Sequence, residues 1–235
     1  MLRYLNLRTH RPAKVTLAPL SMTIKSFVFN PFGENTYVVS DRSGECIIID
    51  PGCYTREEEQ ELSDYIREED LKPVRLLNTH AHLDHILGNE FVCTKWKLLP
   101  ELHAADLELL RSAHLYGELW GIRATPSPDP VKQLAEGEII RFGNTSLRVL
   151  FVPGHCPGHV AFYAEAEKAI ISGDVLFRDS IGRTDLPGGD YDILMNSIRE
   201  RLMTLPDDVQ VYSGHGPVTS IGRERNGNPF LLEAL

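Results

Sequence analysis

Four side chains that can bind metal ions lie close together in the stretch Thr79-His80-Ala81-His82-Leu83-Asp84-His85. An apolar run ending at Leu77 comes directly before them, so the cluster is predicted to lie in a loop that leaves a β-strand. Imidazole suits zinc, iron and related ions, and a carboxylate adds the negative charge that a second dication needs. The spacing therefore predicts a metal centre rather than histidines scattered over the surface.

Three more candidate ligands follow, each after an apolar run and a small turn residue. They are His155 in Val152-Pro153-Gly154-His155, Asp174 in Ile171-Ser172-Gly173-Asp174, and His215 in Tyr212-Ser213-Gly214-His215. Two dications about 3.5–4 Å apart need an anionic bridge, and a bound metal ion lowers the pKa of water to about 7. These residue types favour metal-assisted chemistry with a water-derived nucleophile at neutral pH.

Two sets of strands must hold these loops. The first set is predicted over residues 24–29, 36–40, 46–49 and 74–77, and the second over 139–140, 147–152, 160–163, 169–171 and 209–213. Helices are predicted over residues 56–69, 104–119 and 191–204, and another begins in 86–93. Two sheets packed face to face, with helices outside, are the architecture consistent with this order.

Together these stretches resemble the metallo-β-lactamase-fold superfamily, and within it the glyoxalase II type of thioester hydrolase. The resemblance covers roughly residues 23–230 and includes Ile49-Asp50-Pro51-Gly52 as the first motif. The run from Gly182 to Asp190, which contains Gly-Arg-Thr-Asp, is similar to the small bacterial glyoxalase II-like branch. The resemblance implies an α/β fold, an αββα sandwich of two mixed β-sheets flanked by helices, formed by residues 22–235 as a single domain.

The resemblance also implies a division of the ligands between two divalent metal ions, most simply zinc, with iron and manganese as alternatives. His80, His82 and His155 would hold the first ion, Asp84, His85 and His215 the second, and Asp174 would bridge them. A metal-bound hydroxide would then attack the carbonyl of a small-molecule thioester such as S-lactoylglutathione, with Asp84 as the catalytic residue that orients the hydroxide.

Three further residues are predicted to support or extend the site. By resemblance Asp50 holds the ligand loop without binding metal, and His159 is predicted to be a supporting group rather than a ligand. Arg183 has two interpretations: an anion clamp for a substrate carboxylate, or a loop residue paired with Asp185 or Asp190. Tyr116 and Trp120 are equally compatible with a pocket wall and with the core.

Two rival functions remain open. A mononuclear iron persulfide dioxygenase would use His80, His155 and Asp174, and it shares the Gly-Arg-Thr-Asp run. The complete second ligand set favours the hydrolase. A metal-stabilised binding scaffold is the non-enzymatic alternative.

The substrate is less closely defined than the reaction. Only 20 residues follow His215, fewer than in full-length glyoxalase II, so specificity for glutathione does not follow from the resemblance. We expect weak β-lactam hydrolysis or none.

Composition narrows the remaining choices. The 235-residue chain has 42% hydrophobic residues and a formal net charge of −9, which disfavours a nucleic-acid partner. No apolar run approaches the ~20 residues that cross a bilayer, and the four cysteines show no CxxC pairing. We therefore expect a cytoplasmic enzyme with free thiols and no membrane partner; the oligomeric state is not predicted. Residues 1–21 are basic and without acidic side chains, and we expect a non-essential extension here rather than the alternative, a targeting peptide.

Overall fold

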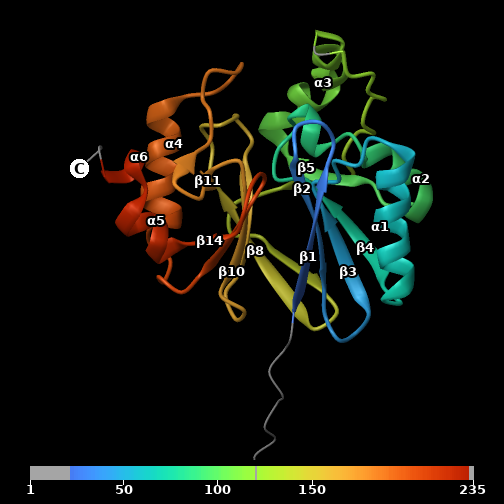
Figure 1. Cartoon of the computed structure of the whole chain (residues 1–235), viewed down its shortest axis with the longest axis horizontal. Coiled ribbons are helices and arrows are strands. Elements are labelled where there is room, and N and C mark those ends of the chain that lie inside the picture. The colour runs from blue at the N-terminus through green and yellow to red at the C-terminus, as the bar shows by residue number, and fades with distance from the viewer. Residues whose placement is uncertain (1–21, 120, 233–235) are drawn as a thin grey trace, which may run out of the picture.

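The computed structural model describes residues 22–119 and 121–232; the predicted extension 1–21 and Trp120 lie outside the described residues. Two mixed sheets pack face to face, with helices on both outer faces (Figure 1). The predicted αββα sandwich is therefore confirmed. Within the described residues no helix is both long enough and apolar enough to cross a membrane.

The first sheet contains six strands in sequential order. They are β1 (Thr23–Phe29), β2 (Glu34–Ser40), β3 (Glu45–Ile49), β4 (Lys72–Leu77), β5 (Pro100–His103) and β6 (Lys132–Leu134). The first two pairings are antiparallel and the last three are parallel. Because β3 and β4 are parallel, Asp50 and the histidine cluster leave the sheet at the same edge.

The second sheet runs in the order β14-β13-β10-β9-β8-β7. Its strands are β7 (Ile139–Phe142), β8 (Thr145–Phe151), β9 (Val160–Ala164), β10 (Ala169–Gly173), β13 (Gln210–Ser213) and β14 (Thr219–Ser220). A small hairpin of β11 (Leu176–Phe177) and β12 (Ser180–Ile181) follows Asp174. The parallel pair β10 and β13 places Asp174 and His215 at one edge of this sheet.

The helices are α1 (Arg56–Glu68), α2 (Asn89–Trp96), α3 (Leu107–Leu119), α4 (Tyr191–Ser197), α5 (Ile221–Gly227) and α6 (Pro229–Leu232). Helix α1 starts at a capping box in which Thr55 and Glu58 satisfy each other's backbone amides. The predicted helix over 191–204 is interrupted, because α4 gives way to a π-helical turn over Ile198–Leu202. The helix predicted from residue 86 begins at Asn89, after a 3₁₀ turn over Leu83–His85.

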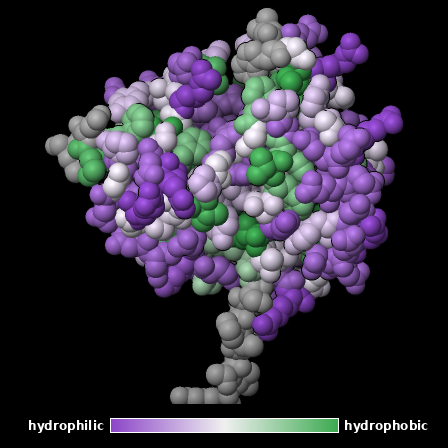
Figure 2. Space-filling view, viewed as in Figure 1, coloured by the Kyte–Doolittle hydropathy of each residue, from purple (hydrophilic) through white to green (hydrophobic). Residues whose placement is uncertain are grey.

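Alternating strand residues feed separate layers of the core. Ile47 and Ile49 pack between the two sheets with Phe162, whereas Ile48 faces outward against Leu62 of α1. Helices α4, α5 and α6 cover the outer face of the second sheet. The side of the molecule shown in Figure 2 is mostly hydrophilic, with hydrophobic residues gathered toward the centre of the view. The packed sheets thus hold rigid strand ends, from which the candidate ligand loops project.

Candidate metal centre

Four loops meet at one edge of the sandwich. The loop after β4 carries His80, His82, Asp84 and His85, and the loop between β8 and β9 carries His155. Asp174 follows β10 and His215 follows β13. The structure therefore brings all seven sequence-predicted ligands together, although they are spread over 136 positions of the chain, from 80 to 215.

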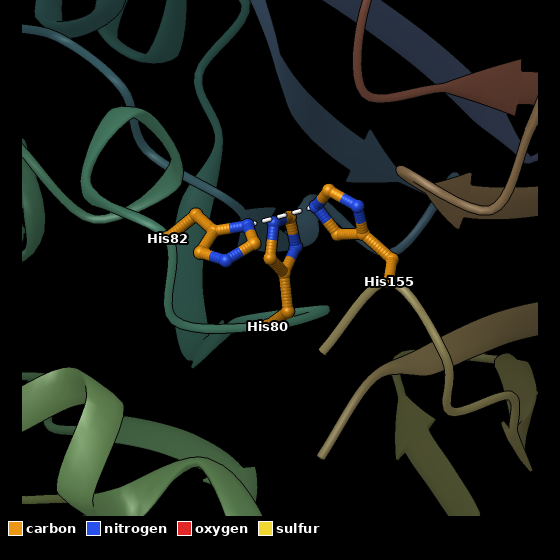
Figure 3. Close-up of side chains that lie close together, drawn as sticks. All are labelled: His80, His82 and His155. Atoms are coloured by element: carbon orange, nitrogen blue, oxygen red, sulfur yellow. Dashed lines mark hydrogen bonds between the residues drawn. The ribbon is translucent and has the colours of Figure 1, made fainter. Parts of the chain in front are cut away.

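The first candidate set is His80, His82 and His155, whose ring nitrogens lie within 4.8 Å of one another (Figure 3). His82 Nδ1 and His155 Nε2 are 2.7 Å apart, as the dashed line in Figure 3 marks. Two imidazole nitrogens this close need a proton or a cation between them. His80 lies fully buried beside them, and its Nε2 atom has no hydrogen-bond partner among the described residues. Three convergent imidazole nitrogens suit a divalent metal ion.

The second candidate set is Asp84, His85 and His215, also within 4.8 Å. Asp84 Oδ2 is 3.1 Å from His215 Nε2 and 3.5 Å from His85 Nε2. Asp174 lies between the two sets, because its Oδ1 is 3.4 Å from His85 Nε2 and its Oδ2 is 3.6 Å from His155 Nε2. The Asp174 carboxylate is therefore within reach of both candidate sets, at the position of the bridge that the resemblance implies.

In three of these histidines, the Nδ1 atom has a hydrogen-bond partner on the side away from the other candidate ligands. His155 Nδ1 lies 2.8 Å from the carbonyl of Arg183, and His215 Nδ1 lies 3.2 Å from that of Gly33. A carbonyl only accepts, so Nδ1 donates and Nε2 is left free to bind a metal ion. Asp50 Oδ2 plays the same part for His85, at 3.2 Å from its Nδ1.

Asp50 could be grouped with His80 and His85 as a third set by distance alone. Its carboxylate, however, also accepts the backbone N–H and the hydroxyl of Thr79. Asp50 is therefore already satisfied, which agrees with the supporting role predicted for it. His159 contacts two candidate ligands, since its Nε2 accepts the backbone N–H of Asp174 at 3.0 Å and its ring stacks on His80.

The charges around the centre fit metal ions. Burial and the neighbouring histidines hold the pKa of His80 well below its ordinary value, and burial lowers the pKa of His82 to about 3, so both are neutral and can ligate. Burial opposes a charge on His85, yet Asp84 and Asp174 raise its pKa well above the ordinary value. Two buried atoms that lack a hydrogen-bond partner among the described residues, His85 Nε2 and Asp174 Oδ1, lie 3.4 Å apart in the same space. The donor set therefore fits two divalent ions.

Two buried carboxylates of the site were missed in the sequence analysis. Asp106, just before α3, accepts hydrogen bonds from both histidine loops. Glu34 is fully buried, with Oε1 3.8 Å from His85 Nδ1, and its backbone pairs with His215. Glu34 begins β2, so this strand starts two residues before the strand predicted over 36–40. An ionisable residue at the start of an apolar strand was the available signal.

A cavity of about 830 Å³ opens over the centre and includes His82, Asp84, Asp174 and His215 in its lining. Much of the remaining lining is apolar, with Phe32, Leu83, Leu109, Ala113, Tyr116 and Phe177. Tyr116 thus belongs to the cavity wall, and it is 40% exposed. The cavity is large enough for a small organic substrate.

Two arginines border this cavity in different states. Arg183 forms a bidentate pair with Asp185, with both N–O distances 2.7 Å, while Asp190 instead caps α4. The loop interpretation of Arg183 is thus the interaction present. Arg178, missed in the sequence analysis, donates to the carbonyl of Val218, and no carboxylate lies within 4.0 Å of it among the described residues.

Residues 29–215 match the model of the family described as "Metallo-beta-lactamase superfamily". The chain belongs to this superfamily. It is 42% identical over 204 residues to "Probable metallo-hydrolase YqgX" of Bacillus subtilis (strain 168), covering 86% of this chain and 93% of the relative. It is 36% identical to "Hydroxyacylglutathione hydrolase GloC" of Haemophilus influenzae, covering 89% and 98%. The chain is thus a member of a metallo-hydrolase superfamily.

Two solved structures are similar in sequence as well as fold. The structure titled BLEG-1 B3 metallo-beta-lactamase has a TM-score of 0.82 and 36% identity, covering 89% of this chain and 99% of that one. The structure titled TTHA1623 in a di-iron-bound form has a TM-score of 0.79 and 40% identity, covering 88% and 100%. The second title shows that a similar protein holds two iron ions.

Proposed function

We propose that this protein hydrolyses small-molecule thioesters with the help of two divalent metal ions. The observation that carries the proposal is Asp174, placed between a set of three histidines and a set of one aspartate and two histidines. The name of the Haemophilus influenzae relative, hydroxyacylglutathione hydrolase, supports a thioester substrate. Zinc fits the nitrogen-rich first set, and the di-iron neighbour keeps iron as an alternative.

Seven residues would hold the two ions. His80, His82 and His155 would hold the first ion, Asp84, His85 and His215 the second, and Asp174 both. When bound, such ions supply Lewis acidity and a water of low pKa at neutral pH. Asp84 lies at the cavity floor with its carboxylate 15% exposed, where it can orient an attacking water and accept its proton. No serine or cysteine nucleophile is needed, which suits the buried position of Cys156.

The cavity would select and hold the thioester. Its apolar wall from α3, with Leu109, Ala113 and Tyr116, can exclude water from one side of the acyl or thiol group. Polar groups gather on the floor and at the border formed by Arg178 and Arg183. A thioester carbonyl placed over Asp84 and Asp174 would lie next to the candidate metal sites. Contacts between the cavity wall and the rest of the substrate would position it there.

The decisive experiment measures metal content and S-lactoylglutathione hydrolysis on the same preparation. We expect two metal ions per chain and turnover that is lost with the metals and restored on their return. One iron per chain, with oxygen consumed on a persulfide and no thioester cleavage, would replace this proposal with the dioxygenase alternative.

β-Lactam hydrolysis is the second candidate, because a structure titled as a B3 metallo-β-lactamase is 36% identical to this chain. We nevertheless expect it to be weak or absent, since the Gly-Arg-Thr-Asp run favours the thioesterase branch. Nitrocefin turnover distinguishes the two. A kcat/KM of about 10⁴ M⁻¹s⁻¹ or more, within the ordinary range of enzymes, would make β-lactams the better substrate class.

A further inference from the structure

Asp106 is a fully buried carboxylate that is neither a candidate metal ligand nor part of the cavity lining. It ends the 3₁₀ turn Ala104–Asp106 and directly precedes α3. A buried carboxylate is costly unless its oxygens accept hydrogen bonds, so the groups that it contacts indicate its purpose.

Donors from both halves of the first candidate set converge on Asp106. Its Oδ2 accepts the backbone N–H of Ala81 at 3.1 Å and the thiol of Cys156 at 3.0 Å. Its Oδ1 accepts the backbone N–H of Gly158 at 2.5 Å. Ala81 stands between His80 and His82, and Cys156 directly follows His155. One carboxylate therefore joins the two loops that carry all three nitrogen ligands of this set.

Asp106 approaches the loop that carries His155 closely enough to restrict the residue at position 158. A Cβ atom on Gly158 would lie 2.6 Å from the backbone nitrogen of Asp106 and 2.7 Å from its carboxyl carbon. Glycine is thus required here by contact rather than by backbone conformation. The glycine in the sequence His155-Cys156-Pro157-Gly158-His159 makes room for Asp106.

The contacts of Asp106 are also selective. None of its hydrogen-bond donors is a residue of the second set or directly adjoins Asp84, His85 or His215. The helix that follows Asp106 supplies Leu109, Ala113 and Tyr116 to the cavity wall. The same carboxylate therefore ties the start of the substrate wall to the first set of ligands.

We propose that Asp106 is a positioning residue for the first metal site, holding the His80–His82 loop and the His155 loop at the separation that one ion requires. The inference rests on the metal sites of the proposed function. An asparagine at this position offers one oxygen in place of two, so at least one loop would face an amide donor instead of an acceptor. Loss of supporting partners typically lowers metal affinity about 10–100-fold.

The test measures zinc affinity by competition with a chromophoric chelator in two backgrounds. Asp84→Ala retains the first set, and His82→Ala retains the second. We expect Asp106→Asn to weaken zinc binding about 10–100-fold in the Asp84→Ala background and by less than about threefold in the His82→Ala background. Unchanged affinity in the first background, or an equal loss in both, would overturn the proposal.

Asp41→Asn is the matched control. Asp41 is also buried, and its carboxylate accepts the backbone N–H groups of Ser43 and Asn144 and the Thr145 hydroxyl. It precedes β3, whereas Asp50 and the ligand loop that Asp50 holds lie at the opposite end of that strand. The Asp41→Asn substitution should lower the melting temperature without changing zinc affinity. A loss of zinc affinity in Asp41→Asn as large as in Asp106→Asn would assign both effects to general destabilisation.

Two features keep the result interpretable. If Asp106→Asn does not fold, Gly158→Ala replaces it, because the added methyl group displaces the His155 loop from Asp106. The same loss of zinc affinity, confined to the Asp84→Ala background, is then expected. Zinc affinity is measured without substrate. A wild-type protein that binds two zinc ions but cleaves no thioester would therefore refute the proposed function and leave the inference about Asp106 standing.

Discussion

The carboxylate of Asp50 accepts both the backbone N–H and the hydroxyl of Thr79, at 2.6 and 2.5 Å. Thr79 directly precedes His80, and the same carboxylate lies 3.2 Å from His85 Nδ1. Asp50 itself has a φ of 49°, a left-handed conformation that few residues other than glycine, asparagine and aspartate adopt readily. The end of β3 is therefore shaped to hold both ends of the four-ligand loop.

The first prediction concerns this pairing. Asp50→Asn keeps the size and the backbone preference of the residue but places an amide donor against donors of Thr79 and His85. We expect a loss of about 1–3 kcal/mol of stability and about 10–100-fold in metal affinity or activity. Thr79→Val, which removes only the hydroxyl, should cost less, and the double variant should be clearly non-additive. Wild-type metal affinity in Asp50→Asn would contradict the supporting role.

The second prediction concerns the bridge. Asp174 contacts members of both sets, whereas Asp84 contacts only members of the second. Asp174→Ala should lower the occupancy of both sites, and Asp84→Ala should mainly empty the second. Elemental analysis after dialysis against a fixed free zinc concentration gives the two stoichiometries. A single metal ion in the wild-type protein at saturating metal would refute the two-site assignment.

The third prediction concerns the cavity arginines. Arg178 has no carboxylate partner among the described residues, while the guanidinium of Arg183 is occupied by Asp185. We expect Arg178→Gln to lower kcat/KM about tenfold, or ~1.4 kcal/mol, for a thioester whose thiol carries a carboxylate, and to spare a neutral thiol. Arg183→Gln should affect both substrates equally, because it loosens the loop. The comparison uses one acyl group on both thiols, and the reverse pattern would return the anion clamp to Arg183.

The fourth prediction concerns the stability of the metal-free protein as pH changes. Burial lowers the pKa of His82 to about 3 and depresses those of His80 and His159, so acidification below the unfolded value of about 6.5 favours unfolding. Despite burial, Asp84 and Asp174 raise the pKa of His85, whose contribution is present below about 6.5 and fades as pH rises through its folded pKa. The melting temperature should therefore be highest near pH 6–7.

Thermal melts from about pH 4 to about pH 9 test this expectation. A decrease of several degrees on the acid side is expected, since about 1 kcal/mol moves the melting temperature of a chain of this size by about 2–4 °C. His82→Asn, which removes one depressed histidine, should flatten the acid side. A wild-type melting temperature that stays constant between about pH 6.5 and about pH 4 would contradict the prediction.

The sequence by itself determined the candidate ligands and the layers that carry them. Each of His80, His155, Asp174 and His215 follows an apolar run and a turn, and such local patterns specify strands and loop starts without knowledge of the fold. Alternating residues such as Ile48 and Ile49 likewise specify two buried faces. The short strands β5 and β6 were not predicted, because a segment of three or four residues is too short to show a periodic pattern.

Only the tertiary structure decided how the candidate ligands are held. Asp106 reaches Ala81 and Gly158 across separations of 25 and 52 residues, and Glu34 pairs with His215 from the other end of the chain. Arg183 could bind a substrate anion or Asp185 by sequence alone, and the folded loop places it on Asp185. A ligand type is a property of one residue, whereas a hydrogen bond depends on where packing brings a second residue, which no local pattern of this chain encodes.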